Sequence, residues 1–245
     1  MVGKLLLRGM LVGLVGGFLA FGFAHTFGEP NVDKAIAFEE QMDAAKGDAP
    51  EEELVSRPMQ SSFGLLTGSL IYGTALGGIL ALAFAYAYGR VGSVGARETA
   101  ALVALAGIIS VIIVPFIKYP ANPPAIGNPE TIGARTSLYF GMMLISVVAM
   151  FNAVVVARKL AQRHGLWFGS IIAGIAYIIV AVVAMIVLPP IHETPQGFNA
   201  DVLWQFRTAS LGIHLVLWTF WALAFGYLAE RSMATKTGVA RRAYS

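Results

Sequence analysis

Six apolar runs, each about as long as a membrane crossing, constrain this chain more than any other feature. They lie at residues 5–24, 64–88, 99–117, 138–157, 167–188 and 210–229. A helix rises about 1.5 Å per residue, so roughly 20 residues cross a hydrocarbon core about 30 Å thick. A spanning backbone must satisfy its own hydrogen bonds, and the runs lack the alternation of barrel strands. The sequence therefore predicts an all-α, polytopic membrane helix bundle of about six transmembrane helices in three hairpins. Residues 1–245 would form a single membrane domain.

Composition supports this class and excludes others. Charged residues make up only 13% of the chain, whereas a typical soluble domain has about 25%. Cysteine is absent from the sequence, which excludes thiolate metal sites and disulfides. The small excess of Lys and Arg indicates orientation in a bilayer, so we expect a lipid partner and no nucleic acid. Walker A, HExxH and GxSxG motifs are also absent from the sequence, and we expect no enzyme.

The first run has an alternative interpretation. Lys4 and Arg8 precede its apolar stretch, and Gly22, Phe23 and Ala24 could form a signal-peptidase site. Cleavage there would leave five transmembrane helices.

Glycines four residues apart recur in the first two runs. Such spacing lets helix backbones approach closely in lipid, so we expect these two helices to pack within the bundle. The glycines are Gly9, Gly13 and Gly17 in the first run, and Gly64, Gly68, Gly73 and Gly77 in the second.

The distribution of charge predicts the orientation. Both termini and the loops after the second and fourth runs hold 11 of the 17 Lys and Arg residues, and 12 of the 14 acids lie elsewhere. Positive charge favours the cytoplasmic side. We therefore expect a multi-pass protein of the cytoplasmic (inner) membrane with both termini inside. Residues 28–61 would form an outward polar loop with an acidic run, and residues 118–137 an outward Pro-rich loop. Asp33 could cap a short amphipathic helix near residues 34–46.

Histidines and carboxylates at the outward side are candidate metal ligands, because a chain without thiols must use imidazole and oxygen. His25 and Glu29 are four residues apart and would share a helix face. His192 and Glu193 follow the fifth run, and His214 lies about one turn into the sixth. The first four could converge as a metal entry site, and His214 could line the permeation path as a weak ligand. Alternatively, the first four contact water at the interface, and His214 bonds a neighbouring helix.

Cationic side chains also gather at the predicted outward interface. Lys118, Arg135 and Arg207 could surround a permeation pathway, or they could extend along the membrane surface as lysines and arginines commonly do.

Five strings of residues, spread over nearly the whole chain, resemble the cobalt transporter subunit family CbtA. They are Phe27-Gly-Glu29-Pro-x-Val-Asp33-x-Ala-Ile-Ala-Phe-Glu39, Leu54-Val-Ser-Arg57, Pro115-Phe-x-Lys118-Tyr-Pro-x-Asn122-Pro-Pro with Thr131 and Arg135, Leu203-Trp-x-Phe-Arg207, and Gly226-x-Leu-Ala-Glu-Arg231.

The resemblance implies a subunit of a cobalt, or related divalent transition-metal, uptake system that supplies metal for cobalamin. It implies transported Co²⁺ without a tightly bound cofactor, about five membrane helices, and a small one-helix, His-rich partner subunit, CbtB. Either a monomer or an oligomer would fit. The family has no catalytic residues to carry over. Its polar motif positions fall on Asp33, Glu39, Arg57, Lys118, Asn122, Arg135 and Arg207, together with Glu29.

Two other functions fit the sequence. The chain could be a non-transporting membrane scaffold or assembly factor, with the Pro-rich loop as a docking surface. It could also carry an organic anion, bound by a ring of Arg57, Arg135 and Arg207.

Overall fold

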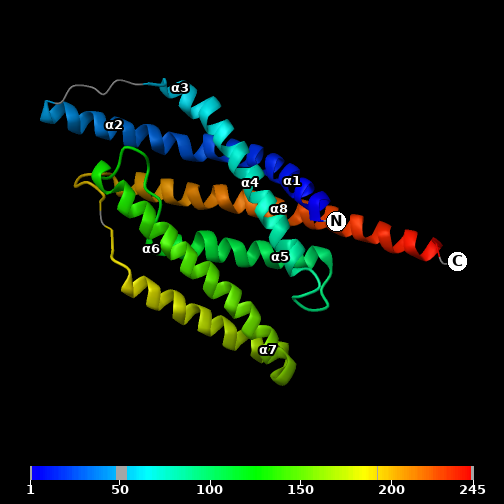
Figure 1. Cartoon of the computed structure of the whole chain (residues 1–245). Coiled ribbons are helices and arrows are strands. Elements are labelled where there is room, and N and C mark those ends of the chain that lie inside the picture. The colour runs from blue at the N-terminus through cyan, green and yellow to red at the C-terminus, as the bar shows by residue number, and fades with distance from the viewer. Residues whose placement is uncertain (1, 48–53, 192, 244–245) are drawn as a thin grey trace. The chain divides into compact units, whose positions relative to one another are not determined.

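A computed structural model of the chain describes residues 2–47, 54–191 and 193–243. These residues are all-helical and contain no strand (Figure 1). Within them, five helices are long and apolar enough to cross a membrane, so the predicted fold class is confirmed, whereas the count of six is not. The five are Val2–Lys46, Arg57–Ala87, Ala96–Lys118, Ile132–Val187 and Ala200–Met233.

Three of the long helices contain a π-helical turn. α1 (Val2–Phe23) continues through η1 (Ala24–Gly28) into α2 (Glu29–Lys46). α3 (Arg57–Met59) leads through η2 (Gln60–Gly64) into α4 (Leu65–Ala87). α5 (Ala96–Gly107) continues through η3 (Ile108–Ile113) into α6 (Val114–Lys118). Pro30 and Pro115 closely follow η1 and η3, and a proline ring clashes with the carbonyl four residues earlier. A widened turn at that carbonyl relieves the clash, so the helix bends and continues.

The helix expected near residues 34–46 is present as α2, but it is longer than predicted. It begins at Glu29 and continues from α1 without a break, and it ends where Gly47 adopts a left-handed conformation with φ 82°. Asp33, predicted to cap this helix, lies inside it, because the helix begins four residues earlier. Asn31, Val32 and Ala35 of this helix are buried, whereas Ala37 and Met42 are exposed.

α7 (Ile132–Val187) reverses direction at Gly165, where φ is 83° and ψ is 158° (Figure 1). Its two halves pack against each other. The Oγ of Ser146 and the hydroxyl of Tyr177 lie 2.8 Å apart in a buried hydrogen bond, and Gly169 contacts the backbone of Ala157 and Ala161. Two of the six apolar runs therefore lie in one helical element, and the number of membrane crossings stays a prediction.

Contacts divide the chain into two compact units. The first comprises Met1–Ala20, Leu66–Ile108 and Leu215–Ser245. Its aromatic core has Trp221 stacked on Phe225 at 4.5 Å between ring centroids, and Phe84 packs edge-on against Phe225 at 5.1 Å.

The predicted glycine contacts are confirmed in part in this first unit. The backbones of α1 and α4 touch at Gly13 with Gly73 and at Gly9 with Gly77, with no space for a side chain. Gly68, also expected at this contact, instead faces open space.

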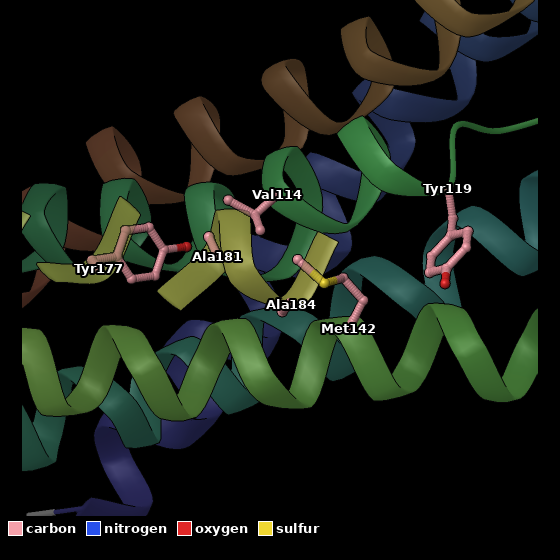
Figure 2. Packing of buried hydrophobic residues seen from close by; sticks show 6 residues of the cluster. All are labelled: Val114, Tyr119, Met142, Tyr177, Ala181 and Ala184. Carbon is pink, nitrogen blue, oxygen red and sulfur yellow. The ribbon is translucent and has the colours of Figure 1, made fainter. Parts of the chain in front are cut away.

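The second unit comprises Phe21–Leu65 and Ile109–His214. Figure 2 shows the centre of its apolar core, in which α6 packs against both halves of α7. Met142 is fully buried there. The six buried residues of this cluster are Val114, Tyr119, Met142, Tyr177, Ala181 and Ala184.

Candidate functional site

The first polar group of the second unit surrounds Arg57, at the start of α3. Its Nη2 pairs with Oε2 of Glu29, and its Nε pairs with Oδ1 of Asp33 at 2.9 Å. The two carboxylates lie four residues apart on α2, so they share one helix face. The side chains of Arg57 and Glu29 are only 22% and 14% exposed, which shields this pair from water. We call Glu29, Asp33 and Arg57 the Arg57 cluster.

His25, one turn before Glu29, is exposed and lies on η1. Its Nδ1 lies 3.1 Å from the carbonyl oxygen of Ser61, and its ring stacks on Phe21. The imidazole therefore joins η1, in the middle of the first long helix, to η2.

The second polar group lines a cleft of about 870 Å³. α6, α7 and α8 (Ala200–Ala243) meet there with the connections at residues 119–131 and 188–199, and the first of these includes the 3-10 turn η4 (Pro129–Thr131). We call it the cationic cleft, because the described charged side chains that line it are three cations and one carboxylate. Its polar lining residues include Lys118, Tyr119, Asn122, Arg135, Thr136, Tyr139, Glu193, Thr194, Arg207, Ser210 and His214.

The arginines of the cationic cleft have different partners. Nε of Arg135 lies 3.1 Å from Oε2 of Glu193, and its Nη2 donates to the carbonyl oxygen of Asn128 at 3.3 Å. Arg207 instead donates to neutral acceptors. Its Nε bonds the carbonyl oxygen of Ala121 at 3.2 Å, and its Nη2 bonds Oδ1 of Asn122 at 2.9 Å. Arg135 is thus neutralised by a carboxylate, whereas Arg207 keeps its positive charge.

Lys118 is the third cation of this cleft and ends α6. Its Nζ lies 5.7 Å from the ring centroid of Tyr119, a contact that does not neutralise its charge.

The Pro-rich connection at residues 119–131 is held in place at several points. Carbonyl oxygens of the connection accept hydrogen bonds from Arg135 and Arg207. In addition, the hydroxyl of Tyr119 donates to the carbonyl oxygen of Pro189 at 2.8 Å. Burial raises the pKa of Tyr119 above its ordinary value, so the hydroxyl stays protonated and keeps donating. Pro123 and Ile126, which belong to this connection, are themselves buried. This connection therefore forms a fixed wall of the cationic cleft.

Four of the five candidate metal ligands are described, and they fall into two places. His25 and Glu29 lie at the Arg57 cluster, Glu193 and His214 line the cationic cleft, and His192 lies outside the described residues. Among the described residues, no three His, Asp or Glu side chains form a group that could hold a metal ion. The metal site therefore stays a prediction. The acidic run at residues 51–53 also lies outside the described part.

The motif residues of the resemblance gather in the same two places. Arg57, Glu29 and Asp33 meet in the first, and Lys118, Asn122, Arg135 and Arg207 line the second. Glu39 belongs to neither group and lies exposed on α2.

Sequence reasoning did not predict two contacts of the cleft, the Arg135–Glu193 pair and the Tyr119–Pro189 bond. Their partners are 58 and 70 residues apart, too far for any local spacing rule. The one available signal was the position of Tyr119 inside the string that is richest in proline.

The chain was compared with protein families, curated proteins and solved structures. A family described as "Probable cobalt transporter subunit (CbtA)" matches residues 2–230. The comparisons with curated proteins and with solved structures gave no match. The five membrane-length helices and this family together indicate a multi-pass membrane protein with a transporter role, and a subunit implies a partner. Since the match covers nearly the whole sequence, the chain belongs to the CbtA family of probable cobalt transporter subunits.

Proposed function

We propose that the chain is the membrane subunit of a cobalt, or related divalent transition-metal, uptake system in the cytoplasmic membrane. The metal would supply cobalamin synthesis, and the partner would be the small one-helix, His-rich subunit CbtB. The observation that carries this proposal is the family match over residues 2–230. Helices long enough to cross a bilayer support it.

The cationic cleft is the proposed place of metal capture. Glu193 and His214, both half-buried, contribute a carboxylate and an imidazole, the ligand types that borderline divalent ions accept. Glu193 must first leave Arg135 to bind a metal through the same oxygen. The carboxylate of Glu193 would move from Arg135 to the metal. Because Glu193 lies in the 188–199 connection, metal capture would be coupled to a movement of that connection.

Measurement of labelled Co²⁺ uptake tests the proposal in cells that produce the chain with its partner subunit. Uptake should exceed that of cells lacking the chain. Glu193→Gln and His214→Ala should each lower uptake on the order of tenfold, since each removes one metal–ligand bond. Glu130→Gln is the matched control, because Glu130 is exposed on the 119–131 connection and does not line the cationic cleft.

Equal uptake with and without the chain would contradict cobalt transport. Normal uptake by both Glu193→Gln and His214→Ala would leave transport intact and exclude the cleft as the place of capture.

A further inference from the structure

We infer that the cationic cleft is a binding site for a small multivalent oxyanion, carrying carboxylate or phosphate groups. Lys118 and Arg207 would hold the charged groups of this anion. The site does not rest on the proposed cobalt transport, because it follows from the charge balance of the cleft.

The first argument is that positive charge remains after pairing. Among the described residues, the Arg135–Glu193 ion pair uses the one carboxylate that lines the cleft, so Lys118 and Arg207 keep their charges. Both are half-buried, and neither forms an ion pair with a carboxylate in the described part of the chain. Partly buried cations without a counter-charge are unfavourable, and a bound anion would relieve that cost.

Arg57, in the same unit, is a cation whose charge is balanced by carboxylates. Its guanidinium is similarly half-buried, and it contacts the carboxylates of both Glu29 and Asp33. The contrast assigns a structural role to Arg57 and leaves Arg207 available to a ligand. An anion ring of Arg57, Arg135 and Arg207 would therefore need three ion pairs to break, two at Arg57 and one at Arg135.

The orientation of Arg207 supports the same conclusion. Ala121 and Asn122 hold two of its N–H groups, so the guanidinium is fixed in one place before any ligand arrives. Its other N–H groups can donate to an oxyanion, and the planar fork suits carboxylate and phosphate. The ammonium of Lys118 and the hydroxyls of Tyr139 and Ser210 line the same cleft and add donors.

The size and the lining of the cationic cleft suit a small organic anion. The volume of about 870 Å³ falls in the range of pockets that hold small molecules, roughly 300–1,000 Å³. Phe116, Ile117 and Phe140 give the cleft an apolar wall for the carbon frame of such a ligand. Lys118 and Arg207 would repel a bare cation, whereas a bound anion would offset their charge and make Glu193 and His214 more accessible to a metal.

Calorimetric titration tests the site. The full chain, in nanodiscs of phosphatidylcholine at low salt, is titrated with citrate and separately with inorganic phosphate. Citrate should bind saturably and release as salt is added. Lys118→Gln and Arg207→Gln should each weaken the affinity roughly tenfold or more, the effect of losing one charge-assisted hydrogen bond. Lys34→Gln should leave it unchanged, because it removes the same charge from an exposed position on α2.

Nanodiscs containing phosphatidylglycerol distinguish two sources of the anion. If that lipid competes with citrate, the natural ligand is a lipid headgroup, and if it does not, the ligand is a soluble anion. Both results support the site. Arg207→Gln also removes the hydrogen bonds that hold the 119–131 connection. Lys118→Gln breaks no hydrogen bond among the described residues, so it separates loss of charge from misfolding. Absence of saturable binding of either anion to the unsubstituted chain would overturn the inference. Equal loss of affinity in Lys34→Gln would also overturn it.

Discussion

Three arginines illustrate how the surroundings of a residue decide its role. Arg57, Arg135 and Arg207 each lie near the start of a helical segment, and from sequence they are equivalent. Among the described residues, the first contacts two carboxylates, the second contacts Glu193, and the third donates to neutral acceptors. Arg57 and Arg135 therefore join segments of the chain, whereas Arg207 can also serve a ligand.

At this scale, Arg57→Gln should destabilise the fold by about 1–3 kcal/mol, because it leaves the shielded carboxylate of Glu29 without its cation. Lys46→Gln removes an exposed pair with Asp43 and should cost less than about 1 kcal/mol. Denaturant unfolding in detergent, followed by circular dichroism, measures both. Equal stability of the two variants would show that the Arg57 cluster is no more than a surface contact.

Tyr119→Phe should cost about 1 kcal/mol, since it removes the donor to the carbonyl oxygen of Pro189. The pKa of Tyr119 is raised by burial, so the neutral phenol's contribution is complete below about pH 10, the ordinary tyrosine pKa, and falls above it. Unfolding measured from about pH 6 to pH 9 should therefore show a constant difference between variant and parent. Tyr139→Phe, which removes no hydrogen bond to the protein in the described residues, is the control. A difference that disappears already near neutral pH would contradict the assignment.

At the scale of elements, the α1–α4 contact depends on backbone touching backbone. A Cβ at Gly73 would meet the carbonyl oxygen of Gly13 and the Cα of Gly17, the latter at 2.9 Å. Gly73→Ala should therefore destabilise the fold by about 1–3 kcal/mol, the usual cost of overpacking.

Gly68→Ala on the same helix is the matched control. Its Cβ would enter open space, so its only effect should be improved helix propensity, worth up to about 1 kcal/mol. Thermal unfolding of both variants in the same detergent tests the contact. A loss of stability in Gly68→Ala equal to that in Gly73→Ala would show that this glycine contact is not specific.

The reversal within α7 depends on a single residue. Gly165 has φ 83° and ψ 158°, a conformation that is open to glycine and strained for other residues. Gly165→Ala should cost about 1–3 kcal/mol. Gly174→Ala, in the second half of α7 with open space around it, should not destabilise the fold and, like Gly68→Ala, should gain only helix propensity. If unfolding experiments show no difference between the two, the turn does not need a left-handed residue.

At the scale of the whole molecule, the orientation in the membrane can be tested directly, because the chain has no cysteine. Lys34→Cys and Arg158→Cys place single thiols at exposed positions on opposite sides of the predicted topology. A membrane-impermeant maleimide should label Lys34→Cys in intact cells and label Arg158→Cys only after the membrane is opened. The reverse pattern would place the Arg57 cluster inside the cell and contradict capture of external metal.

Much of the fold and little of the site could be predicted from sequence. Helix formation in apolar runs is a local consequence of backbone hydrogen bonding without water, so the all-helical membrane class needed no tertiary information. The sequence did not predict that α1 continues into α2, because a proline near a π-helical turn indicates the end of a helix.

The sequence by itself determined the membrane-length helices, the family strings, and the glycines that let two backbones touch. Only the tertiary structure decided which charged side chains are paired with an opposite charge and which are not. It joined Arg135 to Glu193 across 58 residues and placed Arg207 against Asn122, across 85. The physical reason is that apolar length and helix periodicity act between near neighbours, whereas the charge left at a site depends on which distant residues the packing brings within a few ångströms.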